Sequence, residues 1–372
     1  MDNDELFFAL PAVDKQQLLL ELQSLGARLD VPVEEHGRRG GAGPTDDKAF
    51  MLAGVAAMVP TLGDFARQSP YAVVPDAEGG YCLTHGGTRV MPVAFAPTPQ
   101  FYGLKTKDGI PYKQIAVLHG RDVLATTVSQ RCVRWRREGE RCQFCAIENS
   151  LESGSTVALK KPEHLAAVAE AAVRLDGVRH MVMTTGTMNY RDMGVRYLAR
   201  CTRAVRAAVP DLGIQVQFEP PEDLNDLEQL REAGVDTVGI HLESFDQAIR
   251  ERVTPGKAQI SVERYFETFE RAVEIFGRNQ VSTYIIVGLG DSEASIVEGC
   301  RRVAAMGVYP FVVPLRPVVG TPMAHVETPD PHLMQRIYSR VAANNRTYGL
   351  SFRNSKAGCT RCGACSGIAA FE

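Results

Sequence analysis

The sequence predicts an α/β fold built around a parallel β-sheet, and two features predict it. From residue 124 onward, six short runs rich in β-branched and aromatic residues alternate with longer stretches whose apolar side chains recur at helical spacing. Each run is apolar at nearly every position, which is typical of strands covered on both faces. The six predicted strands are residues 124–129, 180–185, 213–219, 235–242, 280–287 and 308–315. An open doubly wound sheet and a partial α/β barrel both satisfy this pattern.

Polar or glycine-containing segments follow each predicted strand. In both architectures, ligands bind beyond the carboxyl ends of the parallel strands, so we expect the functional site at this edge. In strand order, the segments are Cys132 and the residues after it, Thr184-Thr185-Gly186, Glu219-Pro220, Glu243, Gly288-Leu289-Gly290 and Arg316-Pro317.

Two differently patterned regions flank the predicted sheet. Residues 1–115 contain a helix near residues 15–29, a glycine-rich turn at residues 37–44 and short strands with an Asp108-Gly109 turn signal. We interpret this region as an α+β accessory domain. The glycine-rich turn lacks the Lys-Ser or Lys-Thr pair of a phosphate-binding loop, which favours a structural role. Residues 326–372 contain one helix and then a segment rich in glycine and cysteine.

The charge and hydropathy of the chain exclude several classes of partner. The net charge is −3 and the isoelectric point is about 6.3, so no global basic field is available to hold nucleic acid or anionic lipid. The first five residues are acidic where a signal peptide is basic, and no apolar run approaches the ~20 residues needed to span a bilayer. We therefore expect a cytoplasmic protein that binds neither nucleic acid nor membrane.

Six of the nine cysteines form two triads. In a reducing compartment, clustered cysteines indicate metal or redox chemistry rather than structural disulfides. Cys132, Cys142 and Cys145 form the first triad, on the loop after the first predicted strand. Three thiolates leave one metal position open, whereas a structural zinc site or a fully ligated cluster takes four ligands. The triad favours an iron–sulfur cluster with an open iron, and the alternatives are a zinc knuckle or three buried thiols.

The first triad resembles the cysteine motif of the radical S-adenosylmethionine (SAM) superfamily. That family spaces its cysteines by three and then two residues. The second spacing is kept in Cys142-Gln143-Phe144-Cys145, with an aromatic residue that the family packs near the adenine, but nine residues separate Cys132 from Cys142. The resemblance covers roughly residues 116–325, over which it implies a partial (β/α)6 TIM-type barrel. It also implies a [4Fe–4S] cluster, SAM and a low-potential reductant such as flavodoxin or ferredoxin.

Further segments resemble the other motifs of this family, in the family's order. Residues 184–187 stand at the glycine-rich motif that contacts the methionine amine, without its acidic residue. Residues 241–246 resemble the strand end that contacts the ribose and amine. Residues 252–257 and then Arg264 resemble the segment whose arginine pairs with the SAM carboxylate, and residues 286–290 resemble the strand whose backbone meets adenine. The implied cofactor-binding residues are Phe144, Thr185, Gly186, Glu219, Glu243, Arg264 and Gly288, and no protein base is required.

Cys359, Cys362 and Cys365 form the second triad, with two residues in each gap, as in half of a bacterial ferredoxin motif. We expect a second, auxiliary [4Fe–4S] cluster here. Its fourth ligand could be Cys82, Ser366 or none. The alternatives are a zinc site completed by His325 or His332 and a redox-inert tail. Two further cysteines, Cys201 and Cys300, lie within helical patterns and are expected to be buried small hydrophobes.

A barrel of this branch with a second cluster resembles the lipoyl synthases, and more closely the two-component lipoyl synthases. That resemblance implies sulfur insertion into an octanoyl chain on a carrier protein, with a second radical SAM protein as partner. Residues 40–46 and 69–71 equally resemble uncharacterised radical SAM proteins of nitrilase-containing gene clusters. The alternatives are therefore a radical dehydrogenation or rearrangement of a small metabolite and, from another class, a non-catalytic iron–sulfur electron carrier.

Five arginines crowd around Trp135 inside the first cysteine loop. Either they are a solvated loop, or their charges offset the anionic cluster or dock an acidic partner. The five are Arg131, Arg134, Arg136, Arg137 and Arg141.

Overall fold

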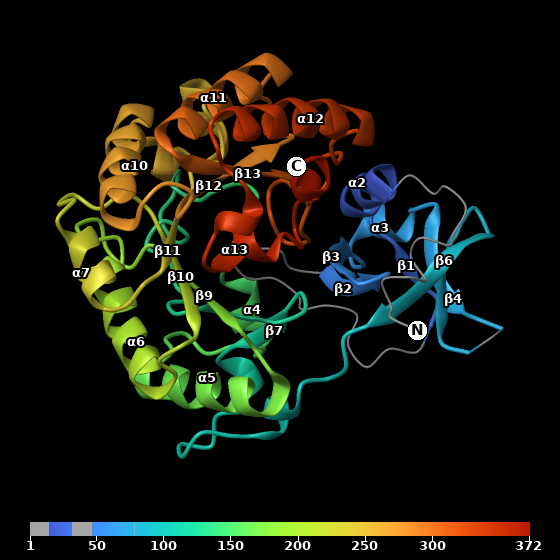
Figure 1. The fold of residues 1–372 in the computed structure, drawn as a ribbon, viewed down its shortest axis with the longest axis horizontal. Helices are drawn as coiled ribbons and strands as arrows, with labels where there is room; N and C mark the ends of the chain where they lie inside the picture. Colours follow the sequence, from blue (N-terminus) through green and yellow to red (C-terminus); the bar gives the residue numbers. More distant parts are fainter. Residues whose placement is uncertain (1–14, 32–46, 78) are drawn as a thin grey trace.

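The fold is an incomplete α/β barrel beside a smaller β-sheet domain, as Figure 1 shows. The structure is a computed structural model, and it describes residues 15–31, 47–77 and 79–372. The acidic first residues and the glycine-rich turn at residues 37–44 lie outside the described residues. No helix within the described ranges is long and apolar enough to cross a membrane.

The barrel sheet confirms the predicted parallel arrangement and resolves it in favour of a partial barrel (Figure 1). Six parallel strands neighbour one another in chain order, and β7 (Val117–His119) pairs antiparallel with β8 at one edge. An open doubly wound sheet would reverse its strand order at a switch point, and this sheet does not. The parallel strands are β8 Val123–Thr127, β9 His180–Thr184, β10 Gly213–Phe218, β11 Thr237–Ile240, β12 Val281–Val287 and β13 Val308–Pro314.

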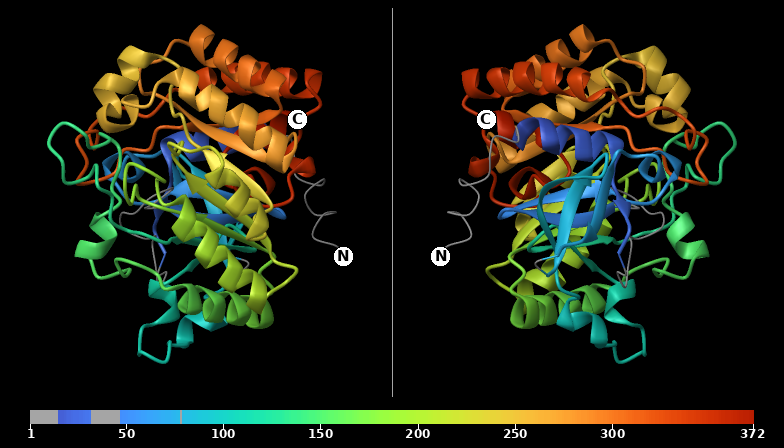
Figure 2. Two further views of the ribbon diagram at one scale, coloured as in Figure 1. Left: turned by 90° about the vertical axis from the view of Figure 1, so that its left-hand side faces the viewer. Right: turned by 90° about the vertical axis from the view of Figure 1, so that its right-hand side faces the viewer.

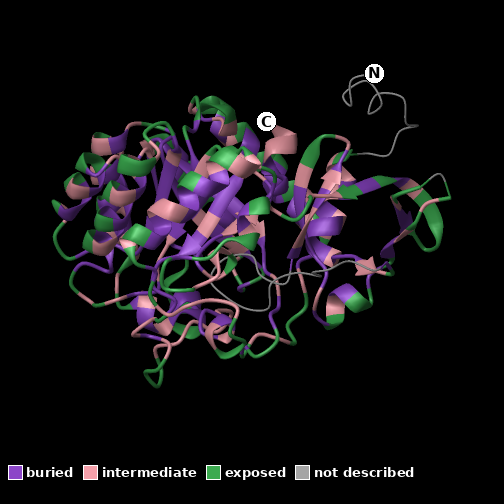
Figure 3. Ribbon diagram, turned by 90° about the horizontal axis from the view of Figure 1, so that it is seen from below, coloured by how far each residue is buried: buried purple, intermediate pink, exposed green. Residues whose placement is uncertain are grey.

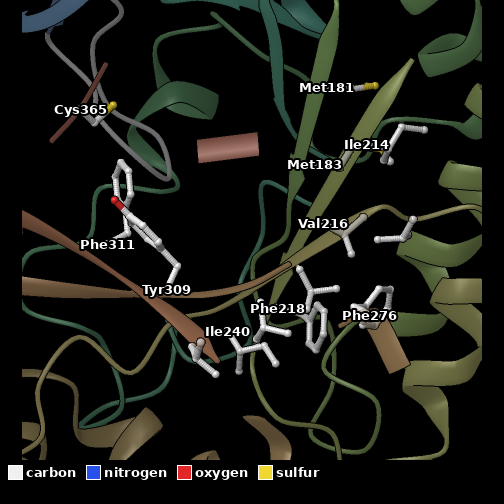
Figure 4. Packing of buried hydrophobic residues seen from close by; sticks show 14 of the residues in the cluster. Met181, Met183, Ile214, Val216, Phe218, Ile240, Phe276, Tyr309, Phe311 and Cys365 are labelled. Atoms are coloured by element: carbon white, nitrogen blue, oxygen red, sulfur yellow. The ribbon is translucent and has the colours of Figure 1, made fainter. Parts of the chain in front are cut away.

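Helices cover the outer face of the barrel sheet, and their green outer surfaces surround the purple strands in Figure 3. Alternate residues of each strand face these helices. On β10, Ile214, Val216 and Phe218 join the apolar core seen in Figure 4, whereas the residues between them are glutamines. The long covering helices are α5 Pro162–Asp176, α6 Val195–Ala208, α10 Val262–Phe276 and α11 Glu293–Met306, and the shorter ones are α4 Asn149–Glu152, α7 Asp226–Glu232, α8 Gln247–Val253 and α9 Pro255–Ala258.

The accessory domain is a six-stranded sheet with its own apolar core, and α2 (Lys15–Leu25) packs against it (Figure 2). The predicted helix near residues 15–29 thus ends earlier, because β1 begins at Arg28. The strands, in the order of the sheet, are β1 Arg28–Leu29, β4 Tyr71–Pro75, β5 Tyr81–His85, β6 Thr88–Phe95, β2 Asp47–Leu52 and β3 Val55–Pro60, and α3 (Asp64–Arg67) follows β3 in the chain. Two 3₁₀ turns then lead to the barrel, η1 Gln100–Gly103 and η2 Tyr112–Gln114.

The last segment of the chain crosses the amino-terminal ends of the barrel strands. Helix α12 (Pro331–Thr347) packs on α11, and the chain then turns inward so that α13 (Gly358–Cys362) lies within the ring of strands in Figure 1. At the start of β11, the Thr237 hydroxyl donates to the carbonyl of Ala357 over 3.3 Å. The segment is completed by the 3₁₀ turns η3 Phe352–Asn354 and η4 Gly367–Phe371.

The accessory domain holds this last segment from the other side. The backbone N–H of Met58 on β3 donates to the carbonyl of Ala364 over 2.7 Å, and the amide of Gln23 on α2 donates to the same oxygen over 3.1 Å. Arg316, just after β13, forms an ion pair with Asp47 and donates to the carbonyl of Met58. The accessory domain, β13 and the cysteine-rich segment are therefore joined by buried polar contacts.

Replacing Gly299 by alanine is expected to destabilise the barrel. Alanine in a helix interior is favoured over glycine by roughly 0.5–1 kcal/mol, but a Cβ at this position of α11 would lie 2.2 Å from the ring of Phe245. We expect the overpacking to dominate and to lower the free energy of unfolding by about 1–3 kcal/mol. Urea denaturation of the metal-free chain measures this loss of free energy of unfolding. The matched control is Gly103→Ala, where a Cβ meets nothing within 4 Å; equal stability of the two variants would contradict the clash.

Candidate active site between two cysteine triads

A cavity of about 250 Å³ lies in the interior of the barrel. Its wall includes the whole first triad, from the loop after β8. It also includes Cys365, from the segment that crosses the amino-terminal strand ends. The cavity therefore reaches from one cysteine triad to the other.

The first triad is held by a loop that is tied to its neighbours through the backbone. Val133 N–H donates to Thr187 O over 2.9 Å, and Gln143 N–H donates to Val253 O over 2.8 Å. Cys132 consequently lines the same cavity as Cys142 and Cys145, despite the nine-residue insertion. The loop thus brings all three predicted ligands to one wall.

Cys365 is buried and the other five triad cysteines are half-buried. Burial raises the pKa of Cys142 well above its usual range and that of Cys145 to about 12. In the second triad, burial raises the pKa of Cys362 to about 12 and that of Cys365 well above its usual range. Because thiolates rather than thiols bind metal, loading either triad has to release protons.

The three cysteines of the first triad lie along the wall of one cavity. Across residues 15–31, 47–77 and 79–372, no three His, Cys, Asp or Glu side chains are gathered closely enough to hold one metal ion. In an iron–sulfur cluster, the thiolates are shared among several irons and need only face a common space. The first triad meets this requirement, since its three cysteines line one cavity.

Glu219, which follows β10, is fixed at the cavity wall by the chain itself. Arg134 donates to Oε2 from Nε over 3.1 Å and from Nη2 over 2.9 Å, while the Thr187 hydroxyl donates to Oε1 over 2.6 Å. Arg134 is only 2% exposed and also donates to the carbonyl of Gly256. This arginine therefore anchors the cysteine loop to the ends of two other barrel units.

Replacing Arg134 by methionine is expected to lower the free energy of unfolding by about 3–5 kcal/mol, because Glu219 would keep a buried charge without its partner. Chemical denaturation of the metal-free chain measures the loss. The control is Arg301→Met, which removes an exposed ion pair with Glu298 and should leave stability nearly unchanged. A variant as stable as the parent would mean that the Arg134–Glu219 pair does not support the loop.

Glu243 enters the cavity from a strained position at the end of β11. Its backbone φ is +67°, and its N–H and C=O bond to Tyr284 and Ile286 on the neighbouring strand β12. The carboxylate forms an ion pair with Lys257, and its Oε2 atom is buried with no hydrogen-bond partner. Burial alone would lower the pKa of Lys257, but the adjacent Glu243 carboxylate raises it well above its usual range. The pair thus offers an ammonium and a free carboxylate oxygen to a ligand.

A stack of rings lines the cavity between the triads. The ring centroids of His241 and Tyr284 are 4.3 Å apart, and those of Tyr284 and Phe311 are 4.9 Å apart. Burial lowers the pKa of His241 to about 3, so this imidazole is neutral. Its Nδ1 accepts from Tyr284 N–H, while its buried Nε2 has no hydrogen-bond partner among the described residues, and His241 is part of the cavity wall.

The other predicted cofactor-binding residues divide into two groups. Phe144, Thr185 and Gly186 line the cavity. Glycine is required at 186, because a Cβ there would lie 2.5 Å from the carbonyl of Arg131. Gly288 and Arg264 do not line the cavity.

The two outlying residues lie against other parts of the barrel. Gly288 has a φ of +109° and packs against Leu315 and Pro329. Arg264 begins α10 and donates to the carbonyls of Pro221 and Glu222 over 3.0 and 2.7 Å. Arg264 therefore supports the loop after β10, next to Glu219, rather than facing a ligand in this structure.

The second triad is surrounded by polar groups from the barrel interior. Gln217 donates to Cys359 Sγ over 3.1 Å, and Gln215 Oε1 accepts from the Cys359 N–H over 3.0 Å. His119 Nε2 lies 3.2 Å from Cys365 Sγ. These polar groups come from β10 and from the end of β7.

The three cysteines outside the triads lie buried in helices or on the accessory sheet. Cys201 and Cys300 are fully buried in α6 and α11, as predicted. Cys82 lies on β5 of the accessory sheet, where it pairs with Val74 and Pro92.

The arginines of the cysteine loop are largely engaged within the chain. Arg136 pairs with Glu148, and Arg137 with Glu140. The guanidinium of Arg141 stacks 3.6 Å from the ring of Trp135. These contacts favour a structural role for the loop, and docking of an acidic partner stays a prediction.

Comparisons with known proteins find a family model that matches part of this chain. Residues 136–303 match the family model of the radical SAM superfamily. The chain is 24% identical over 305 residues to bacteriochlorophyllide c C-7(1)-hydroxylase of Chlorobaculum limnaeum, which covers 76% of this chain and 74% of that protein. It is 28% identical over 172 residues to lipoyl synthase of Bacillus cereus, covering 45% of this chain and 54% of the relative. The latter match spans about half the length of the lipoyl synthase.

Two solved structures also resemble this chain. One is methylornithine synthase (PylB), with a TM-score of 0.47 and 14% identity over 68% of this chain and 72% of that one. The other is the FeFe-hydrogenase maturase HydG of Carboxydothermus hydrogenoformans, with a TM-score of 0.48 and 19% identity over 62% of this chain and 53% of that one.

Proposed function

This chain carries a radical SAM domain, and from that premise we propose that it inserts sulfur at an unactivated C–H position of an octanoyl chain bound to a carrier protein. One observation carries the proposal: the same cavity touches the first triad and Cys365 of the second. A substrate in that cavity lies between a radical-generating cluster and a source of sulfide. In this proposal, residues 1–115 form the accessory domain, residues 116–325 the catalytic barrel and residues 326–372 the cluster-binding tail.

In this proposal, separate groups of residues would bind the two clusters and SAM. Cys132, Cys142 and Cys145 would hold the SAM cluster, and the second triad would hold the auxiliary cluster. When bound, these groups supply an electron that cleaves SAM, a 5′-deoxyadenosyl radical that removes hydrogen from the substrate, and a sulfide that the carbon radical captures. The SAM itself would meet the predicted residues that line the cavity, which are Phe144, Thr185, Gly186, Glu219 and Glu243.

The cavity lining fits an alkyl chain near an ionic cofactor. Apolar side chains from β12, β13 and the loop after β13 form one part of the wall, and the Glu243–Lys257 pair lies on another. The apolar members exclude water from the radical, and the ionic pair can orient the cofactor's amine and carboxylate. The apolar residues are Ile286, Val313, Leu315 and Val318.

The similarity to lipoyl synthase supports the same substrate class. The proposal calls for an octanoylated carrier, a second radical SAM protein for the other sulfur, and flavodoxin or ferredoxin as reductant. The cytoplasm supplies the reducing conditions under which both clusters and their thiolates persist.

The test is anaerobic turnover of protein whose clusters have been rebuilt with a heavy isotope of sulfide. We expect methionine, 5′-deoxyadenosine and a carrier whose mass rises by heavy sulfur. Formation of 5′-deoxyadenosine without any mass gain on the octanoylated carrier would reject sulfur insertion. An omission control lacking reductant should give none of these products.

A second candidate keeps the radical step but uses the auxiliary cluster to bind substrate or move electrons, in a dehydrogenation or rearrangement of a small metabolite. It is favoured by the longer match to a radical SAM hydroxylase, over 76% of this chain. The auxiliary cluster would then be intact after turnover, whereas sulfur donation consumes it. A non-catalytic electron carrier would yield no 5′-deoxyadenosine at all.

A further inference from the structure

We infer that His119 supplies the fourth protein ligand of the auxiliary cluster, an inference that rests on the second cluster of the proposed function. His119 is the last residue of β7, the strand that closes one edge of the barrel sheet. Its Nε2 atom lies 3.2 Å from Cys365 Sγ, so β7 already holds an imidazole at this triad in the metal-free chain.

Gly120, the residue after His119, packs closely against the second triad. Gly120 has a φ of +61°, and a Cβ there would lie 3.2 Å from Cys362 Sγ and 3.5 Å from the Cβ of Ala364. Two of the three cysteines therefore converge on the turn formed by His119 and Gly120. The missing side chain leaves room beside the Cys362 sulfur.

The groups around the triad differ in what they can give to iron. Gln217 meets Cys359 through its NH2 group, which can only donate a hydrogen bond. Neutral imidazole presents a nitrogen lone pair and is a regular ligand of iron, including in iron–sulfur clusters where histidine replaces cysteine. Among these neighbours, His119 is the one suited to complete the coordination.

The earlier candidates for the fourth ligand fit less well. The Ser366 hydroxyl donates to the carbonyl of Val312 over 2.5 Å and accepts from the N–H of Ile368, so it is committed to the backbone. Cys82 belongs to β5 of the accessory sheet.

One other histidine lies at the same level of the barrel sheet. His119 and His180 pair with the same residue, Val123, from opposite sides. The Nδ1 atom of His180, however, lies 2.7 Å from where a Cβ of Gly213 would stand, and the Cβ of Ala357 lies 3.2 Å from the same point. His180 is therefore the matched control for His119.

The consequence for the cluster is a change of charge. A neutral imidazole in place of a fourth thiolate makes the cluster less negative by one charge and raises its reduction potential, as histidine ligation does in Rieske centres. Replacing His119 by cysteine should keep the cluster and lower its potential.

The experiment isolates the auxiliary cluster in full-length protein by replacing Cys132, Cys142 and Cys145 with alanine. The protein carries histidine labelled in its imidazole nitrogens and is reconstituted, reduced and measured by pulsed electron paramagnetic resonance. We expect a strongly coupled nitrogen that is lost in His119→Ala and in His119→Cys and is kept in His180→Ala. In His119→Ala, the nitrogen signal would also disappear if the whole cluster were lost. The His119→Cys variant controls for this, because its thiolate can still bind the cluster.

The outcomes separate the two proposals. A cluster that forms without a strongly coupled nitrogen, or one whose coupling survives His119→Ala, overturns His119 as a ligand and leaves the second cluster standing. Weak coupling alone would make His119 a hydrogen-bond donor to Cys365 and would equally overturn ligation. If the protein lacking the first triad holds no iron, the second cluster itself is absent and the proposed function fails.

Discussion

Replacing Cys142 by alanine should abolish cleavage of SAM by this chain. Cys142 lines the cavity beside Cys132 and Cys145, and a cluster deprived of one of its three thiolates cannot present a single open iron. We expect 5′-deoxyadenosine formation to fall below detection in anaerobic assays with dithionite, while the auxiliary iron is retained.

The control for this variant is Cys201→Ala, which removes a fully buried cysteine from α6, away from the cavity wall. It should keep its iron and its 5′-deoxyadenosine formation. Undiminished SAM cleavage by Cys142→Ala would mean that the radical site lies elsewhere.

The triple variant Cys359→Ala, Cys362→Ala and Cys365→Ala should separate radical formation from product formation. With two four-iron clusters, the anaerobic protein holds about eight irons, and this variant should hold about four. It should still form 5′-deoxyadenosine, because the first triad is intact, but the octanoylated carrier should gain no sulfur.

Iron and sulfide analysis, combined with mass spectrometry of the carrier, measures both effects in one preparation. Cys300→Ala, in the core of α11, is the control and should retain the full iron content. Full iron content in the triple variant would contradict a cluster at the second triad, and sulfur transfer by that variant would contradict sulfide donation from it.

Much of the barrel is predictable from sequence, because buried parallel strands and amphipathic helices leave a strong local pattern. All six predicted strands are present, and no strand end differs from its predicted position by more than two residues. The largest difference is at β11, predicted over residues 235–242 and observed as Thr237–Ile240. Beyond Ile240 the regular ladder is interrupted, and Glu243, at a positive φ, forms only an isolated bridge with Ile285 on β12.

The site is predictable only in part. Motif resemblance led to Phe144, Thr185, Gly186, Glu219 and Glu243, all of which line the cavity. The resemblance also predicted Arg264 as a cofactor-binding residue, but Arg264 does not line the cavity. Its side chain packs against the loop after β10 instead, and the sequence pattern does not reveal that direction.

Three cavity residues were not singled out from the sequence. His241 and Lys257 lie within the segments 241–246 and 252–257 that resemble family motifs, whereas Tyr284 lies in no such motif, and the three line one cavity through the closure of the barrel. A usable signal was present in β10, where Gln215 and Gln217 alternate with apolar residues. That period of two indicates a strand with one polar face, and so a barrel whose interior is functional rather than filled.

The contact between Ala364 and the accessory domain has a consequence for how the protein matures. Met58 and Gln23 bind the carbonyl between Cys362 and Cys365, and these partners are synthesised some 300 residues before it. Until this segment has been synthesised and has docked, the amino-terminal end of the barrel lacks Cys359, Cys362 and Cys365. In the proposed function, iron therefore reaches the second triad only after residues 359–365 have been synthesised and have docked on the barrel.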